Sequence, residues 1–166
     1  MVLHLKSTTI IDENSPFHLQ TKDILIKDGI IQKIEKKIDS PVDRVIELDN
    51  LHISTGWFDS SVSFGEPGFE ERETLQNGMD TAMKSGFTSV ILNANTNPVL
   101  DNASLIQYIK NRSDSHIIDV LTTGALTEKS KGQHMAELYD MHKSGAVAFG
   151  DYKSSITNAN LLKIAF

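Results

Sequence analysis

From Gly56 onward the sequence alternates short apolar segments with amphipathic ones, and this alternation restricts the possible fold more than any other feature. The apolar strand candidates are residues 57–64, 87–94, 116–122 and 146–149. The helix candidates between and after them are residues 70–85, 103–111, 133–144 and 158–166. Successive strand–helix units with apolar strands predict a parallel sheet covered by helices. We therefore expect an α/β fold for residues 55–166.

Four such units correspond to the first half of a (β/α)8 barrel of the TIM type, which typically takes about 250 residues when complete. An isolated half would leave two unpaired strand edges and an open core. The helical pattern also continues to Phe166 without a C-cap. We interpret the chain as the N-terminal portion of a longer protein, apparently truncated within the barrel. The alternative is an open four-unit α/β sheet that is complete in itself.

The first 54 residues follow a different pattern, in which short strands are joined by tight turns. Asp28 and Gly29 separate the apolar segments 23–27 and 30–34. The Asp-Gly pair is typical of a two-residue hairpin turn, because both of its positions require positive φ angles. Further strands are expected at residues 2–11 and 45–48. We predict a small N-terminal β module over residues 1–54, followed by a second domain over residues 55–166.

Charge and composition narrow the classes of partner. The 166-residue chain has a net charge of −6 and no basic cluster, which argues against nucleic acid and anionic membrane as partners. No apolar run approaches the roughly 20 residues that a membrane span needs. The sequence contains no cysteine, which excludes cysteine-based metal sites and fits a cytoplasmic protein.

The segment from Gly56 to Glu70 carries the clearest signal about chemistry. Residues i and i+2 of a strand point to the same side, so Asp59, Ser61 and Ser63 are expected to share one face. Two histidines at positions 61 and 63 would form an imidazole clamp for zinc. A neutral serine hydroxyl is a poor zinc donor beside imidazole, thiolate or carboxylate. Whether the protein can act as a metal-dependent hydrolase depends on these two positions.

Four segments of the chain, in order, carry a family resemblance: residues 28–34, 56–59, 66–70 and 93–102. Together they span nearly the whole chain, and the set resembles dihydroorotase and its cyclic amidohydrolase relatives. Active members of that family close N-carbamoyl-L-aspartate reversibly to dihydroorotate in pyrimidine biosynthesis. The family's zinc polarises the carbonyl and lowers the pKa of a bound water. The resemblance implies an amidohydrolase barrel, with the N-terminal β module forming part of a composite β-sandwich.

The resemblance also assigns roles to single positions. Ser61 and Ser63 stand where the family has its two zinc-binding histidines. Gly65 stands where the family has the arginine that grips the substrate carboxylate, a contact suited to guanidinium. Asn95 matches a substrate-binding asparagine. Asp151 matches an aspartate that bridges to the metal, and the remaining zinc histidines and the catalytic aspartate would lie on later strands.

The leading hypothesis is a dihydroorotase-like protein that has lost zinc hydrolase chemistry, with zinc absent or weakly bound and no catalytic residue in this chain. By the resemblance, such a protein serves as a structural partner of aspartate transcarbamoylase, and self-association is the other expected partnership. One alternative is an active cyclic amidohydrolase whose metal is held by Asp151 and by ligands beyond Phe166. Another is a non-catalytic protein that binds a small cyclic amide through Asn95.

Each candidate residue also has a plainer interpretation. Ser61 and Ser63 have no visible base that would make either one a nucleophile, so they are interpreted as small polar fillers. Asp59 is interpreted as a hydrogen-bonded strand residue rather than as a metal ligand. Asn95 either contacts a ligand or only forms a turn. Asp151 either retains a metal contact or caps a loop.

Overall fold

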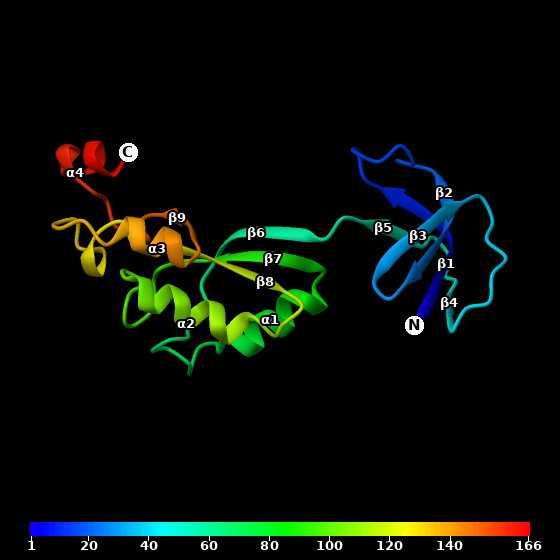
Figure 1. Ribbon diagram of the computed structural model, residues 1–166, viewed down its shortest axis with the longest axis horizontal. Coiled ribbons are helices and arrows are strands. Elements are labelled where there is room, and N and C mark those ends of the chain that lie inside the picture. Colours follow the sequence, from blue (N-terminus) through cyan, green and yellow to red (C-terminus); the bar gives the residue numbers. More distant parts are fainter. The chain divides into compact units, whose positions relative to one another are not determined.

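The computed structural model describes residues 1–166 and divides the chain into two compact units (Figure 1). The first unit is Met1–Thr55 and the second is Gly56–Phe166. The first unit contains only strands, whereas the second alternates strands with helices. The expected α/β fold class is confirmed: a small β module precedes a parallel sheet with the strand and helix order of a half barrel.

The first unit is a five-stranded sheet. Its strands are β1 (Val2–Ile11), β2 (Thr21–Lys27), β3 (Ile30–Glu35), β4 (Arg44–Ile46) and β5 (His52–Ser54). The main order is β3-β2-β1-β4, and β5 also pairs with β1. β1, β2 and β3 pair antiparallel, while β4 and β5 run parallel to β1. The predicted Asp28-Gly29 hairpin is confirmed, and both residues have positive φ angles.

A buried carboxylate, that of Asp23 in β2, connects three segments of the first unit. Its Oδ1 accepts a hydrogen bond from the Ser7 backbone N–H at 3.0 Å, and its Oδ2 accepts one from the Ile38 N–H at 3.0 Å. His4 Nε2 lies 3.1 Å from Oδ2, an ion-pair contact rather than a well-directed hydrogen bond. Burial raises the pKa of Asp23, but the hydrogen bonds lower it by more than burial raises it. The pKa therefore lies below its ordinary value.

The second unit is a four-stranded parallel sheet in the order β6-β7-β8-β9. Its strands are β6 (Trp57–Val62), β7 (Phe87–Leu92), β8 (Asp119–Gly124) and β9 (Ala146–Phe149). Its helices are α1 (Leu75–Lys84), α2 (Ala103–Ser113), the 3-10 helix η1 (Glu128–Ser130), α3 (Leu138–Ser144) and α4 (Ala159–Ala165). None of the helices in the protein is both long enough and apolar enough to cross a membrane.

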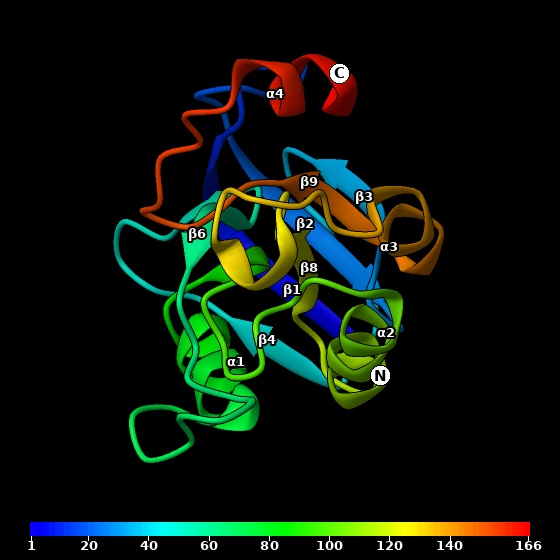
Figure 2. The same cartoon turned by 90° about the vertical axis from the view of Figure 1, so that its left-hand side faces the viewer.

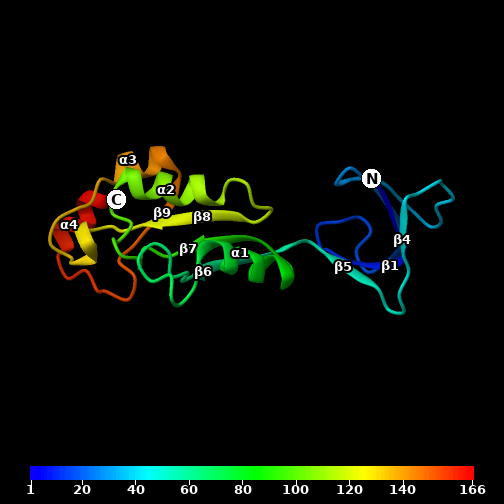
Figure 3. The ribbon, with the colours of Figure 1, turned by 90° about the horizontal axis from the view of Figure 1, so that it is seen from below.

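Helices α1, α2 and α3 lie along the outside of the sheet (Figure 2), with α2 and α3 next to β8 and β9 (Figure 3). The main core of the protein lies between these helices and the strands. Val90 and Leu92 of β7 are almost fully buried there, as are Met79 of α1 and Ile109 of α2. The alternation of inward and outward residues along β7 therefore fixes which of its faces meets the helices.

Several elements begin later than the sequence predicts. The helix expected at residues 70–85 begins at Leu75, because the Thr74 side chain caps it by accepting the Asn77 N–H. The helix expected at residues 133–144 begins at Leu138. Residues 70–72 form turns instead, whereas Met135 forms a β-bridge with Thr127, and the Ala136 N–H donates to the Leu126 carbonyl at 3.0 Å.

The strand expected at residues 116–122 also begins later, at Asp119, and β5 was not expected at all. The His116 ring explains the first shift, because its Nδ1 accepts the Ile118 N–H at 3.1 Å and holds residues 116–118 in a turn. The three-residue strand β5 is formed by its pairing with β1, which no local pattern indicates.

We expect Asp23→Asn to lower the free energy of unfolding of the Met1–Thr55 unit by about 2–3 kcal/mol, because an amide cannot replace a buried, fully bonded carboxylate. Because the pKa of Asp23 is lowered in the folded state, its carboxylate stabilises the wild-type fold at pH values above the ordinary carboxyl pKa. This stabilisation is lost as the pH falls through the pKa of Asp23 in the folded protein. Hydrogen exchange of the Ser7 and Ile38 amides, measured as a function of pH, gives both the loss of stability in Asp23→Asn and the pH dependence of the wild-type protein. Asp39→Asn, an exposed change in the same loop as Ile38, is the matched control.

Candidate functional site

The predicted site residues come together at the carboxyl ends of β6, β7 and β9, where the active sites of barrel enzymes lie. Ser61 and Ser63 come from the end of β6, and Asn95 follows β7. Asp151 and Tyr152 follow β9. The parallel arrangement explains the assembly, because the carboxyl ends of parallel strands all meet at one edge of the sheet.

A bulge in β6 decides which side chains enter the site. Asp59 pairs with Val90, but Val62 pairs with Leu92, so β6 has one more residue than β7 over this interval. The extra residue places Asp59 beside Val62 in the cavity next to α1, while Ser61 lies among the site residues. The expectation that Asp59 shares a face with the two serines is therefore wrong. Its Oδ1 instead accepts the Ser61 backbone N–H at 2.9 Å.

Two asparagine amides hold the serine hydroxyls. Asn93 Nδ2 donates to Ser61 Oγ at 3.1 Å and to Ser63 Oγ at 3.4 Å, and Asn95 Nδ2 donates to Ser63 Oγ at 3.1 Å. Asn95 Oδ1 is buried and has no hydrogen-bond donor. Sequence reasoning identified Asn95 but missed Asn93, although the i, i+2 spacing of the two residues places both on one face.

Tyr152 is the second residue that sequence reasoning missed. It is half-buried, and the Lys153 ammonium lies 5.1 Å from the centre of its ring. The neighbouring Ser63 hydroxyl, followed by the Lys153 ammonium, lowers the pKa of the Tyr152 phenol below its ordinary value, and the positive charge of Arg72 acts in the same direction. The signal in the sequence was the Tyr152-Lys153 pair, which departs from the family pattern.

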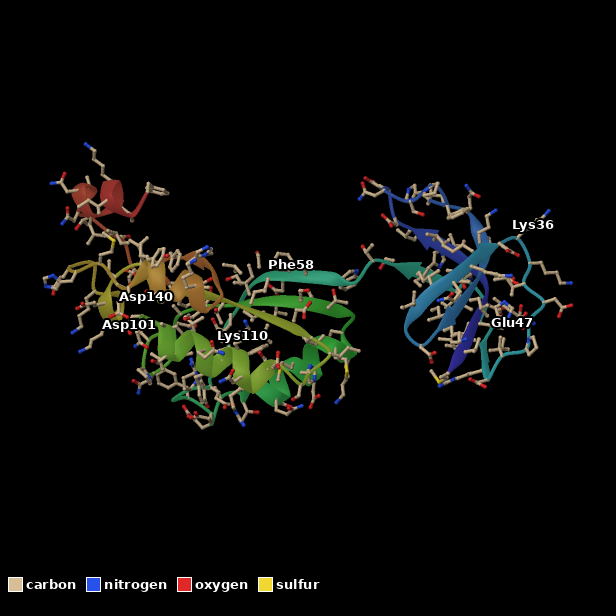
Figure 4. All side chains as sticks on the ribbon, viewed as in Figure 1. Lys36, Glu47, Phe58, Asp101, Lys110 and Asp140 are labelled. Carbon is tan, nitrogen blue, oxygen red and sulfur yellow. The ribbon has the colours of Figure 1, made fainter.

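Asp151 is buried, and both of its oxygens have donors. Oδ1 accepts the Thr127 backbone N–H at 2.9 Å, and Oδ2 accepts the Thr127 hydroxyl. Thr127 Oγ1 in turn accepts the Gly132 N–H at 2.8 Å, which closes the loop around η1. Asp101, labelled in Figure 4, supports the same loop by accepting the Lys129 N–H at 2.9 Å. Asp151 therefore organises a loop here, and a contact with metal stays a prediction.

Gly65 has no room for a side chain in this loop. A Cβ at this position would lie 1.9 Å from the Phe69 carbonyl oxygen and 2.8 Å from the Glu73 carbonyl oxygen. Both contacts are with backbone atoms, which cannot move without a change in the loop. The arginine that the resemblance places at this position would therefore require another loop conformation.

The side chains of residues 1–166 do not fit a zinc ion. Ser61 and Ser63, at the positions where the resemblance places two histidines, carry hydroxyls, which are weak zinc donors and are already bonded to amides. No three histidine, aspartate or glutamate side chains lie close enough together to hold a metal. Three of the six histidines, His4, His18 and His52, belong to the Met1–Thr55 unit.

Glu66 anchors the loop that follows the site strand. Its Oε2 accepts the Leu75 N–H at 2.9 Å, and its Oε1 accepts the Tyr108 hydroxyl at 3.0 Å and two Arg112 nitrogens at 3.2 and 3.1 Å. The carboxylate is only 4% exposed. Burial raises the pKa of Glu66, but these hydrogen bonds and the Arg112 charge outweigh it and lower the pKa below its usual value.

The same loop contacts the loop that carries Asn95. The Pro67 carbonyl accepts the Asn97 N–H at 2.9 Å. Gly68 packs on the Asn97 carbonyl so closely that a Cβ would lie 1.9 Å from its oxygen, and its φ of +94° also requires glycine. Glu66 therefore fixes, through one short chain of contacts, where Asn95 lies relative to Ser63.

The fold matches solved amidohydrolase barrels. An L-hydantoinase from Arthrobacter aurescens superposes with a TM-score of 0.72 at 20% identity, over 89% of this chain and 32% of that protein. A crystal structure of a dihydroorotase gives a TM-score of 0.61 at 13% identity, over 89% of this chain and 41% of that one. These likenesses define the class of fold, the first half of an amidohydrolase (β/α)8 barrel.

Sequence comparison identifies the family. Residues 52–165 match the family model described as dihydro-orotase-like, and the chain belongs to that family. It is 36% identical over 165 residues to the dihydroorotase of Pelotomaculum thermopropionicum, covering 99% of this chain and 38% of that protein. It is 34% identical over 144 residues to the dihydroorotase of Aquifex aeolicus, covering 86% of this chain and 34% of that one. The chain thus spans little more than a third of the curated relatives it matches.

We expect Glu66→Gln to lower the free energy of unfolding of the Gly56–Phe166 unit by about 1–3 kcal/mol, because the buried amide nitrogen would face a donor of Leu75, Tyr108 or Arg112 instead of accepting from it. Urea unfolding followed by the fluorescence of Trp57, the single tryptophan, measures the change. Glu71→Gln removes an exposed carboxylate from the same loop and should change the unfolding free energy by less than about 0.5 kcal/mol. Equal effects of the two substitutions would contradict the role assigned to Glu66.

Proposed function

We propose that the chain is part of a dihydroorotase-like protein without zinc hydrolase activity. The observation that carries the proposal is the hydrogen-bonded network of Ser61, Ser63, Asn93 and Asn95, which occupies the histidine positions of the family. Hydroxyls that already accept amide protons are poor zinc ligands. Gly65 supports the same conclusion, because its loop leaves no space for the arginine that would hold the substrate carboxylate.

The family resemblance suggests what such a protein does. A non-catalytic relative would serve pyrimidine biosynthesis as a cytoplasmic structural partner of aspartate transcarbamoylase or as a self-associating scaffold. Size-exclusion chromatography of the protein alone and mixed with aspartate transcarbamoylase from the same source tests both partnerships. Co-elution supports the first, and a concentration-dependent dimer supports the second. Separate elution of the two proteins, with this protein monomeric at every concentration, contradicts both.

A second function, binding of a small cyclic amide without catalysis, is favoured by the unpaired amide oxygen of Asn95. Asn95 keeps the position that contacts substrate in the family, and its buried Oδ1 has no donor within the protein. Buried acceptors without a donor are rare in folded proteins, and a ligand N–H would satisfy this one. This function is compatible with the first, because a scaffold protein can keep a ligand site.

We expect the purified full-length protein to contain far less than one zinc per chain and to show no turnover of N-carbamoyl-L-aspartate. Elemental analysis after incubation with zinc and a cyclisation assay measure the two quantities. Ser61→His/Ser63→His restores two imidazole donors and should raise zinc affinity above that of the wild type, because imidazole is a far better zinc ligand than a hydroxyl.

Stoichiometric zinc with turnover in the wild-type protein would overturn the proposal. That result would favour the alternative, an active cyclic amidohydrolase whose metal is held by Asp151 and by ligands outside these 166 residues. Ser60→Ala is the control for changes in β6 that lie outside the network, and it should leave zinc content unchanged.

A further inference from the structure

The hydroxyl of Ser63 is set up to act as a donor towards a bound molecule. A serine hydroxyl offers two lone pairs and one proton. Asn93 Nδ2 and Asn95 Nδ2 both donate to Ser63 Oγ, at 3.4 and 3.1 Å, and amide nitrogens can only donate. Both lone pairs are therefore in use, and the proton is what the hydroxyl has left to offer. Because Ser63 is exposed, a ligand can reach this proton.

The Asn95 carboxamide places an acceptor next to this donor. Its nitrogen is bonded to Ser63 Oγ, whereas its Oδ1 is buried and has no donor within the protein. The Ser63 proton and the free Oδ1 are thus separated only by one planar amide group and the hydrogen bond that it donates. The site therefore presents one donor and one acceptor side by side, and both lack a partner.

A ligand that uses both atoms needs a C=O and an N–H group on the same side. In an open-chain secondary amide the two groups point in opposite directions, because the amide bond is planar and trans. The cis form costs about 2.5 kcal/mol in simple secondary amides. A small ring forces the cis form and puts the C=O and the N–H on one edge. The donor and the acceptor of the site together therefore favour ring-closed amides, imides and ureas over open-chain ones.

We propose that Ser63 determines the specificity of this site for the cis amide edge of a cyclic ligand. Its hydroxyl donates to the ligand carbonyl oxygen, while Asn95 Oδ1 accepts the adjacent N–H. Asn93 is a positioning residue, because its Nδ2 holds the oxygens of both Ser61 and Ser63 and so keeps the Ser63 proton directed away from the protein amides. The inference rests on the second proposed function, the binding of a cyclic amide without catalysis.

Calorimetric titration of the full-length protein with three neutral probes of similar size tests the proposal. Dihydrouracil has cis amide edges. Its N,N′-dimethyl derivative keeps the ring and the carbonyls but has no N–H, and N,N′-diethylurea has both groups in the open-chain trans arrangement. The wild-type protein is expected to bind dihydrouracil about tenfold or more tightly than either of the others, because each of them leaves one hydrogen bond of the pair unmade.

Two substitutions of Ser63 separate its hydroxyl from its place in the fold. Ser63→Ala removes the donor and should weaken dihydrouracil binding by about tenfold, whereas Ser63→Thr keeps a hydroxyl and should bind dihydrouracil within about threefold of the wild type. Ser60→Ala, exposed on the same strand but outside the network, should bind all three probes like the wild type. Circular dichroism confirms that each variant is folded.

The binding pattern distinguishes failure of the inference from failure of the function on which it rests. If the wild-type protein binds all three probes alike, or if Ser63→Ala binds dihydrouracil as tightly as the wild type, the role of Ser63 is overturned and the binding function stands. If the wild-type protein binds none of the probes, the binding function fails and the role of Ser63 fails with it.

Discussion

The Glu66 carboxylate is the interaction on which the site end of the barrel unit depends. It bonds to the first residue of α1 and to Tyr108 and Arg112 of α2, although it belongs to the loop after β6. A buried carboxylate must be fully bonded, so the loop, the start of α1 and the end of α2 have to fold together. Because Pro67 and Gly68 then contact Asn97, the loop that carries Asn95 is fixed by the same group.

The site is built from neutral side chains, the hydroxyls of Ser61 and Ser63 and the amides of Asn93 and Asn95. Glu66 holds the loop after β6 in place, and the side chains that gather at the end of that strand are hydroxyls and amides. These groups bond to one another at 3.1–3.4 Å, so each serine oxygen is stabilised without any ion. The network needs no charged group, because each serine oxygen accepts its hydrogen bonds from neutral amides.

Part of the site could be predicted from single positions and part could not. Ser61, Ser63 and Asn95 were found because strand periodicity and family motifs act locally in the sequence. Asp59 was placed on the wrong face, because a bulge is a property of strand pairing and no local pattern marks it. Tyr152 was missed for a related reason. It is about 90 residues further along the chain than Ser63, and the two residues lie near each other only because β9 joins the same sheet as β6.

The sequence by itself determined the order of the parallel strands and α-helices after Gly56, the Asp28-Gly29 hairpin, the family and the absence of histidines at positions 61 and 63. These features follow from periodicity, turn chemistry and residue identity, which are local properties. Only the tertiary structure decided that Asp151 bonds to Thr127, that Gly65 lies against the Phe69 carbonyl and that the Asn93 and Asn95 amides both donate to Ser63. Hydrogen-bond partners and free space depend on which distant segments the fold brings within about 3 Å of one another.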